Sequence, residues 1–377
     1  MKAIQMVDTK TQYLKIKDQV DAGIQEVLDS AAYINGKHVK SFSQNLSSYL
    51  GVKHTIPCAN GTDALQIAMM ALDLQPGDEV ITPSFTYIAT VEVVGLLRLK
   101  PVFVDVDKDT FCIDPKAIEA AITPKTKAIV PVHLYGQSAN MEAIMAIAKK
   151  HNLFVIEDNA QAIGADYTFS DGTVKKTSSI GTIGATSFYP SKNLGAFGDG
   201  GAIFTNDDAL AEKLLMIANH GQKVRYYHDL IGCNSRLDSI QAAILDVKLK
   251  YLDEYIAARQ KAAAFYDQAF AGNEKLKVPQ TGAYTNHVYH QYTLQLTGAN
   301  RDELNTYLSE HKIPSMIYYP VPAHRQKMFA GFGGSDYHLP VTDWLTERVI
   351  SLPIHTELEE EQLGFITEKV LQFVNGK

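Results

Sequence analysis

Short apolar runs and amphipathic stretches alternate regularly between residues 53 and 157, and this alternation restricts the chain to few folds. The apolar runs predict strands at Lys53–Pro57, Glu79–Thr82, Val102–Asp105, Lys127–Val132 and Phe154–Glu157. The stretches between them predict helices at Thr62–Leu72, Ile88–Leu97, Pro115–Ala121 and Met141–Lys150. Such alternation is typical of an α/β layer with a mostly parallel sheet. Because ligands of these sheets bind beyond the carboxyl ends of the strands, we expect functional side chains directly after strands.

The pattern differs on either side of this region. Upstream, two helices are predicted at Leu14–Leu28 and Phe42–Leu50. Downstream, one long helix is predicted from Ser239 to about Phe270, and the chain beyond it changes character. Smaller elements follow there: a strand near His290–Leu296 and helices at Arg301–His311 and Glu359–Asn375. The sequence therefore predicts a large α/β domain over residues 1–245 and a smaller α+β domain over residues 246–377.

Composition narrows the possible functions. The 377 residues carry a formal net charge of −7 without a long basic run, which argues against nucleic-acid and membrane-surface partners. The cysteines Cys58, Cys112 and Cys233 show neither metal-ligand spacing nor a disulfide framework. The N-terminus has no apolar signal core, and no apolar run approaches the roughly 18 residues of a membrane helix. We expect a cytoplasmic protein without a metal site.

The loop after the first predicted strand enters a helix as Cys58-Ala-Asn-Gly-Thr-Asp-Ala-Leu65. Gly61 and Thr62 are placed to offer backbone N–H groups and a hydroxyl to an anion at the helix N-terminus. A simple helix cap by Asn60 or Thr62 explains the same residues. This motif alone therefore leaves a phosphate site and a cap as alternatives.

Other unusual residues also follow predicted strands. Tyr87 lies after the second strand, where it is either a core residue or able to stack on a flat ring. His133 follows the fourth strand, and we favour a hydrogen-bonded core histidine over a proton-transfer role. Asp158 and Gln161 follow the fifth strand. A carboxylate at the end of an apolar strand is costly unless it meets a cation or a strong donor, so Asp158 is a candidate site residue.

Residues Ser187–Gly201, SFYPSKNLGAFGDGG, place Lys192 between a serine–aromatic stretch and a glycine-rich turn. The apolar run Ala202–Thr205 that follows predicts a buried strand. An ammonium group is costly to bury, and a desolvated lysine is partly deprotonated and can form a Schiff base with a carbonyl. A surface lysine in a hairpin turn is the alternative for this segment.

A Schiff-base lysine, a strand-end carboxylate, a phosphate-binding helix start and an aromatic ring together suit pyridoxal 5′-phosphate. Lys192 would bind its aldehyde, and Asp158 would pair with its pyridinium nitrogen. The phosphate would be held by Gly61, Thr62 and Ser187, the phenolic oxygen by Gln161, and one ring face would be covered by Tyr87. The rival is a nucleotide-binding domain. It leaves Lys192 and Asp158 unexplained, and no G-x-G-x-x-G follows the first strand.

These motifs resemble the DegT/DnrJ/EryC1/StrS group of sugar aminotransferases, which have the aspartate aminotransferase-like fold type I. The resemblance runs from Ile24 to Pro353. It is carried by Cys58–Leu65, Pro83–Thr90, Pro131–Gln137, Ile156–Ala165, Ser187–Gly201 and Asn234–Ala243. It implies a homodimer with shared active sites, in which Asn234 reaches the cofactor phosphate of the neighbouring subunit. Relatives that act as dehydratases replace the lysine with histidine, so Lys192 favours transamination.

The resemblance also suggests a substrate. The Asn-Ser-Arg-Leu-Asp motif with Arg236 is similar to that of enzymes that aminate the C-3 ketone of UDP-2-acetamido-2-deoxy-3-oxo-glucuronate, with L-glutamate as amino donor. Arg236 would bind a carboxylate or phosphate of the sugar nucleotide. Tyr318 and Tyr319 are expected beside the substrate, where many relatives have His-Tyr in place of Tyr-Tyr. Two alternatives stay open: a dTDP-3-keto-6-deoxyhexose aminotransferase, and a non-catalytic regulator that binds the cofactor.

Overall fold

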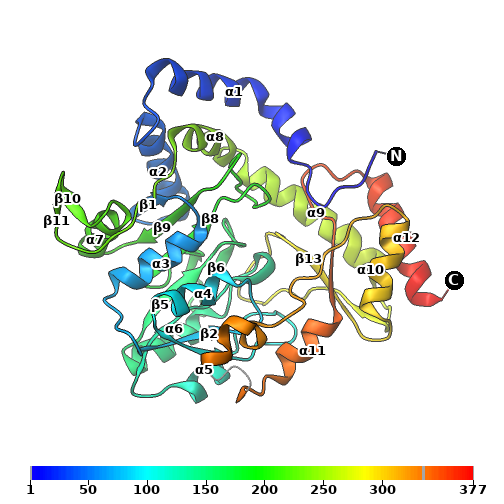
Figure 1. Cartoon of the computed structure of the whole chain (residues 1–377). Helices are drawn as coiled ribbons and strands as arrows, with labels where there is room; N and C mark the ends of the chain where they lie inside the picture. Colours follow the sequence, from blue (N-terminus) through cyan, green and yellow to red (C-terminus); the bar gives the residue numbers. More distant parts are fainter. Residues whose placement is uncertain (1, 333–335, 377) are drawn as a thin grey trace.

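The computed structural model describes residues 2–332 and 336–376 and is built around a seven-stranded sheet (Figure 1). The strand order is β1-β9-β8-β5-β4-β2-β3. The strands are β1 (His54–Cys58), β2 (Glu79–Pro83), β3 (Lys100–Val104), β4 (Thr126–Ile129), β5 (Phe154–Asp158), β8 (Ile183–Ser187) and β9 (Gly201–Thr205). All neighbours pair in parallel except β9, which runs antiparallel to both β1 and β8. The predicted α/β class with a mostly parallel sheet is confirmed.

All five strands expected between residues 53 and 157 are present, and the run Ala202–Thr205 lies within β9. Strand β8 was not expected from the sequence. It lies in the sheet between β5 and β9 and ends at Ser187, so it brings the segment that carries Lys192 to the end of β5. Asp158 at the end of β5 and the loop after β8 thus meet at one edge of the sheet, where ligands of parallel sheets bind.

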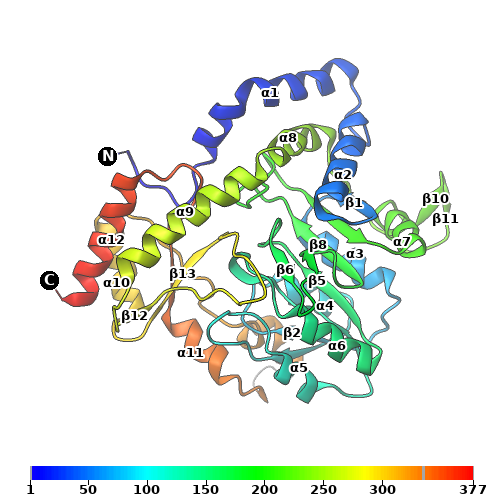
Figure 2. The same ribbon diagram turned by 180° about the vertical axis from the view of Figure 1, so that it is seen from behind.

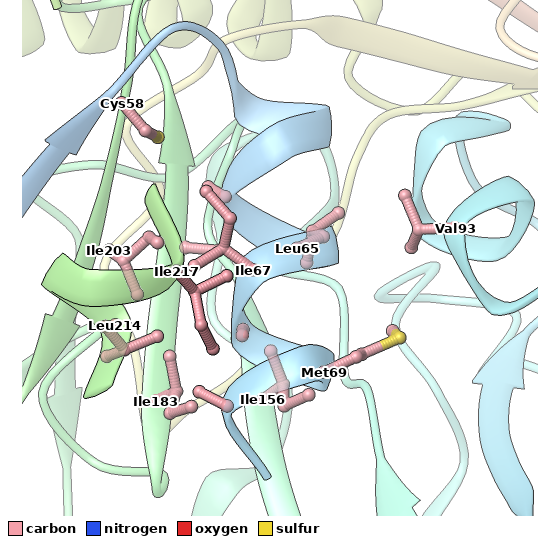
Figure 3. Close-up of a cluster of buried hydrophobic side chains, with 14 of the residues drawn as sticks. Cys58, Leu65, Ile67, Met69, Val93, Ile156, Ile183, Ile203, Leu214 and Ile217 are labelled. Atoms are coloured by element: carbon pink, nitrogen blue, oxygen red, sulfur yellow. The ribbon is translucent and has the colours of Figure 1, made fainter. Parts of the chain in front are cut away.

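Five helices connect or cover the strands of this sheet: α3 (Gly61–Ala71), α4 (Ala89–Leu96), α5 (Pro115–Ala121), α6 (Met141–His151) and α7 (Asp208–Ala218). Figure 3 shows α3 packed on the sheet with α7 on one side of it and α4 on the other. Helix α3 shares one apolar core with the strands and with α7. Its buried side chains include Leu65, Ile67 and Met69, and those of the strands and of α7 include Ile156, Ile183, Ile203, Leu214 and Ile217. Each such fully buried side chain contributes about 1.5–3 kcal/mol through removal of apolar surface from water, so the start of α3 is firmly positioned.

Helices α1 (Thr9–Ser30) and α2 (Lys37–Leu50) pack against α8 (Ser239–Leu249). The long helix expected from Ser239 is wrong as one element, because the chain forms α8 and then α9 (Leu252–Phe270). The break falls at Lys250 and Tyr251, where the backbone changes to tighter bonds such as Tyr251 N–H to the Lys248 carbonyl at 3.0 Å. Neither glycine nor proline marks this break in the sequence.

The C-terminal region packs around the C-terminal part of α9 (Figure 2). A three-stranded antiparallel sheet has the order β12-β13-β14, and helices pack on it around a separate apolar core. These elements are β12 (Leu276–Lys277), β13 (Tyr292–Leu296), β14 (Val349–Leu352), α10 (Arg301–Glu310), α11 (Pro340–Arg348) and α12 (Glu360–Asn375). The division at residue 245 falls inside α8, and it remains a prediction.

Two short hairpins complete the fold: β6 (Asp166–Thr168) with β7 (Val174–Lys176), and β10 (Gln222–Val224) with β11 (Tyr227–His228). Figures 1 and 2 show the β10–β11 hairpin projecting from the molecule beside α7. Within the part of the chain that the structure describes, short 3-10 turns include η1 (Leu134–Gly136), η2 (Ala323–Arg325) and η3 (Lys327–Phe332). Among the helices of the described residues, none combines the length and apolar character needed to cross a membrane.

Candidate active site

The loop between β8 and β9 carries Lys192 and is folded tightly on itself. The Lys192 N–H donates to the Tyr189 carbonyl at 2.8 Å, and the Ala196 N–H donates to the Phe188 carbonyl at 2.7 Å. Gly195 is required by this close approach, because a Cβ there would lie 2.4 Å from the carbonyl oxygen of Pro190. Glycine is needed here because a side chain would not fit beside Pro190, and not because the backbone is left-handed.

Lys192 is partly buried at the carboxyl edge of the sheet. Burial lowers the pKa of its ammonium group to about 8, and the neighbouring Asp158 carboxylate acts in the opposite direction. An amine with a pKa near 8 is neutral in about one-tenth of molecules at pH 7, far more often than a surface lysine. The structure thus brings the predicted Schiff-base lysine and the predicted carboxylate into electrostatic contact.

Asp158 ends β5 and is only 5% exposed. Its Oδ2 accepts a hydrogen bond from the Thr90 hydroxyl at 2.7 Å, and its Oδ1 accepts one from Ala160 N–H at 3.1 Å. A buried carboxylate needs a cation or strong donors, and Asp158 has both, in the two hydrogen-bond donors and the nearby Lys192. Thr90 lies in the first turn of α4, and the sequence analysis did not assign it a role.

His133 is fully buried, as expected for a core histidine. Its Nδ1 accepts from Ala139 N–H at 3.0 Å, so the ring proton lies on Nε2, which donates to Glu157 at 2.9 Å. Both ring nitrogens are therefore occupied by structural contacts.

The side chain of Gln161 is buried and held at both ends. Its Oε1 accepts from Tyr135 N–H at 2.7 Å, and its Nε2 donates to the Tyr319 hydroxyl at 2.9 Å. Tyr135, which the sequence analysis did not single out, also donates through its hydroxyl to the Tyr318 carbonyl. The two predicted substrate tyrosines thus lie in a loop that contacts the predicted cofactor residue Gln161.

Tyr87 follows β2 and is 56% exposed, so the structure excludes the alternative that it is a core residue. Its ring centroid lies 6.0 Å from that of Tyr319, at an interplanar angle of 44°. Tyr319 in turn makes an edge contact with the buried Phe85 at 6.3 Å. The aromatic ring of Tyr87 is therefore supported from one side and open to a flat ligand on the other.

The start of α3 has the form of an anion site. Asn60 is the N-cap, and its Oδ1 accepts from Asp63 N–H at 2.8 Å. The first N–H groups of a helix have no intrahelical partner, which leaves those of Gly61 and Thr62 for a ligand. A Cβ on Gly61 would lie 2.7 Å from the Cβ of Ser187, so only glycine fits beside this serine. The cap by Asn60 is confirmed. The phosphate site stays a prediction, and Gly61 and Ser187, two of the residues assigned to it, lie next to each other.

Asn234 and Arg236 lie in the segment that precedes α8. Asn234 is exposed and accepts a hydrogen bond from the Arg236 guanidinium, whose other branch donates to Asn219 at 2.8 Å. Between them, the Ser235 hydroxyl accepts from Ala59 N–H at 2.9 Å. The segment is thereby fixed to the loop that leads into α3, while Asn234 itself faces outward from this chain.

A family model described as the DegT/DnrJ/EryC1/StrS aminotransferase family matches residues 14–371. A Pseudomonas aeruginosa protein described as a UDP-2-acetamido-2-deoxy-3-oxo-D-glucuronate aminotransferase is 48% identical, covering 96% of this chain and 98% of the relative. A UDP-N-acetyl-3-dehydro-alpha-D-glucosamine 3-aminotransferase from Acidithiobacillus ferrooxidans is 46% identical, covering 99% of each. A Geobacillus stearothermophilus protein described as a pleiotropic regulatory protein is 47% identical, covering 98% of each.

Solved structures agree with this result. The crystal structure of DesV from S. venezuelae has 39% identity and a TM-score of 0.94, with 99% of both chains covered. A Bacillus subtilis structure with the bound cofactor PMP, the aminated form of pyridoxal phosphate, has 32% identity and a TM-score of 0.88. It covers 96% of this chain and 82% of its own. The three-layer fold type I architecture is confirmed.

The residues present fit pyridoxal phosphate. The N–H groups at the start of α3 beside Ser187, the amine of Lys192 and the carboxylate of Asp158 follow or end β1, β8 and β5, whose carboxyl ends lie at one edge of the sheet. Since the family model spans nearly the whole chain and the relatives cover it from end to end, this protein belongs to the DegT/DnrJ/EryC1/StrS aminotransferase family, whose enzymes depend on pyridoxal phosphate.

Proposed function

We propose that this protein transfers the amino group of L-glutamate to the C-3 ketone of UDP-2-acetamido-2-deoxy-3-oxo-glucuronate. The glutamate leaves as 2-oxoglutarate and the ketosugar as the 3-amino sugar, so the ketone oxygen and the amino group are exchanged without an external oxidant. The observation that carries the reaction class is the electrostatic contact of Lys192 with Asp158. The sugar is inferred from the 48% identical relative and from Arg236.

Pyridoxal phosphate, when bound, supplies an electron sink for the pair released as a proton leaves the donor's α-carbon. The Asp158 carboxylate would keep a proton on the ring nitrogen, and its bonds from Thr90 and Ala160 hold it in place for this. The Lys192 nitrogen would bind the aldehyde carbon and then, once displaced by the donor amine, accept the α-proton. Its lowered pKa of about 8 provides the neutral amine that this step needs near physiological pH.

The phosphate would be held by the N–H groups of Gly61 and Thr62 and by the hydroxyl of Ser187. The helix dipole of α3 favours a dianion at this end. Tyr87 would lie on one face of the ring, where its exposed side is open. A flat ring held by its phosphate, one face and one nitrogen is fixed in orientation, which is what stereospecific proton transfer requires.

A homodimer with shared sites would complete the phosphate site through Asn234. Support comes from exposed apolar side chains beyond α7, including Tyr226 at 75% and Ile231 at 88% exposed, which are costly to leave in water. Asn234 belongs to the segment that continues from this region.

We place the reaction in the cytoplasm, where free thiols such as those of Cys58, Cys112 and Cys233 persist.

Subunit mixing tests the shared site. In a dimer of Lys192→Ala with Asn234→Asp subunits, one site would combine an intact Lys192 with an intact Asn234 from the partner. If Asn234 acts across the interface, random pairing of two nearly inactive variants restores about a quarter of wild-type activity. If Asn234 acts within its own chain, each site keeps one lesion and the mixture gains nothing. The second result would refute the shared site.

Arg236 is the candidate ligand for the sugar's carboxylate. Its guanidinium contacts the neutral amides of Asn219 and Asn234, so its positive charge is available to an anion. A planar fork matches a carboxylate better than an ammonium group does. The direct comparison uses protein carrying the aminated cofactor. It is offered either UDP-3-oxo-N-acetylglucosaminuronate or UDP-3-oxo-N-acetylglucosamine, which differ at C-6 by the carboxylate.

We expect the uronate to regenerate the aldehyde form of the cofactor at least tenfold faster, and Arg236→Met to remove this preference. Preference for the uncharged sugar would instead assign the activity of the 46% identical relative. A dTDP-3-keto-6-deoxyhexose is the third probe, and reaction with it alone would refute the uronate assignment while retaining transamination.

The regulator remains a second candidate because a 47% identical relative is described as a pleiotropic regulatory protein. The two candidates differ in the first half-reaction. An enzyme loaded with pyridoxal phosphate converts it to the aminated form when L-glutamate is added, with loss of the yellow colour. A yellow protein that stays unchanged with L-glutamate and with other amino donors would favour the regulator.

A further inference from the structure

Gln161 is held in a single orientation by two unlike contacts. Tyr135 N–H can only donate, so the atom 2.7 Å away must be the amide oxygen of Gln161. The amide nitrogen is then the atom that meets the Tyr319 hydroxyl at 2.9 Å. A primary amide has two N–H groups, and the bond to Tyr319 engages one of them. The direction of the other is fixed by the same geometry.

The Tyr319 side chain is itself fixed. Its ring packs against those of Phe85 and Tyr87, with centroids 6.3 and 6.0 Å away. The carbonyl of the preceding residue, Tyr318, accepts a bond from the buried Tyr135 hydroxyl. Tyr135 therefore holds Gln161 through its backbone and the Tyr319 loop through its side chain.

The same loop is anchored again farther along. The Ser84 hydroxyl lies 2.7 Å from His324 Nδ1, and Ala323 N–H donates to the Ser84 carbonyl at 2.9 Å. Because Ser84 directly follows β2, these bonds attach the loop to the sheet edge that carries the site.

Burial raises the pKa of the Tyr319 phenol, and the nearby Asp158 carboxylate acts in the same direction. The phenol is therefore uncharged near neutral pH, and its oxygen accepts from Gln161 as a neutral group. Tyr318 differs, since its side chain packs edge-on against Tyr319 and the hydrogen bond from Tyr135 goes to its backbone. From the sequence both tyrosines are expected beside the substrate, but in the structure only the Tyr319 hydroxyl contacts Gln161.

We propose that Tyr319 is a positioning residue for the cofactor: its phenol oxygen orients the Gln161 amide so that the second N–H meets the phenolic oxygen of pyridoxal phosphate. The inference rests on the proposed role of Gln161. A donor at the phenolic oxygen stabilises its negative charge and weakens the hold of that oxygen on the proton of the adjoining Lys192 nitrogen. Removing the Tyr319 hydroxyl should loosen this donor and raise the pH at which that proton is lost.

The test compares Tyr319→Phe with Tyr318→Phe in holoenzyme without substrate, by following the absorbance of the bound cofactor against pH. We expect Tyr319→Phe to raise the pH midpoint by about half a unit to one unit, the size of one hydrogen bond weakened. Tyr318→Phe should leave the midpoint within about 0.2 unit. The KM for the ketosugar should change less than about twofold in Tyr319→Phe, since the residue would not touch the sugar.

Gln161→Ala tests the role of Gln161 separately from that of Tyr319. If it shifts the midpoint upward while Tyr319→Phe leaves it unchanged, Gln161 keeps its role and the inference on Tyr319 is wrong. If neither variant moves the midpoint, the role of Gln161 fails and the inference on Tyr319 fails with it. An unchanged midpoint with a ketosugar KM raised tenfold in Tyr319→Phe would return Tyr319 to the substrate.

Discussion

Lys248 is a buried cation that supports the loop of Lys192, and replacing it by methionine tests that support. The side chain is 1% exposed on α8, and its Nζ donates to the Gly195 carbonyl at 2.5 Å. Gly195 is the residue that packs against Pro190 in the tight turn around Lys192. Methionine keeps the length and apolar stem of Lys248 but removes the charge and the hydrogen bond.

The magnitude follows from the lysine's pKa. Burial lowers the pKa of Lys248 from 10.5 to about 8, and the nearby Arg259 cation acts in the same direction. Between pH 8 and 10.5 the unfolded chain therefore binds more protons than the folded one, so the free energy of unfolding rises with pH. The buried charge destabilises the fold by about 3 kcal/mol at pH 7 and by about 1 kcal/mol at pH 9.5.

Lys248→Met relieves this destabilisation and leaves the Gly195 carbonyl without its donor, which costs about 1–3 kcal/mol. At pH 7 the two effects nearly cancel, and the variant should be about as stable as the wild type. At pH 9.5 the buried lysine of the wild type destabilises the fold less, so its replacement gains less. The stability of the variant relative to the wild type should therefore be about 2 kcal/mol lower at pH 9.5 than at pH 7. Urea unfolding of both proteins without cofactor at the two pH values measures this difference.

Gln241 provides the matched control. It lies on the same face of α8, two turns before Lys248, and its Oε1 accepts from Phe197 N–H of the same loop at 2.8 Å. Being uncharged, Gln241→Met should change the unfolding free energy equally at both pH values. A Lys248→Met effect that is just as independent of pH would refute the buried-cation reasoning.

Three further outcomes are expected in the site. Lys192→Ala should abolish turnover while cofactor still binds without a covalent bond, as shown by its release on denaturation and its spectrum; normal turnover would contradict the assignment. Asp158→Ala should slow removal of the donor's α-proton at least about 100-fold at saturating cofactor, measured by the half-reaction with L-glutamate. Gly61→Val should weaken cofactor affinity at least about tenfold by crowding Ser187, and an unchanged dissociation constant would place the phosphate elsewhere.

Much of the site was predictable because parallel strands end at one edge. Asp158 and Gln161 follow a strand whose apolar run is unmistakable in the sequence, and the fold brings them to the edge where Lys192 lies. Gly61 and Thr62 of the proposed anion site could be identified for a similar reason, since a helix that starts directly after a strand presents its N–H groups there. Local sequence order therefore specified which residues gather.

The remainder depends on contacts between distant segments. Strand β8 is short and reads Ile-Gly-Ala-Thr-Ser, so neither length nor alternation marks it, and only pairing with β5 and β9 defines it. Thr90 bonds a residue 68 positions away, and Tyr319 bonds one 158 positions away. No periodicity encodes such pairs. The burial of Lys248 was equally hidden, because a lysine near a helix end is usually solvated.

The dipeptide Glu157-Asp158 shows why a strand end determines function. Side chains alternate across a strand, so two adjacent carboxylates leave β5 on opposite faces of the sheet. Glu157 turns to the structural side, where its oxygens accept from His133 and from the N–H groups of Ser178, Ile180 and Gly181 at 2.6–2.9 Å. Asp158 turns to Thr90 and Lys192. A shift of one residue in the register of β5 would exchange the two faces. Glu157 would then lie where the cofactor nitrogen needs a partner, and Asp158 would face the backbone donors that now bind Glu157.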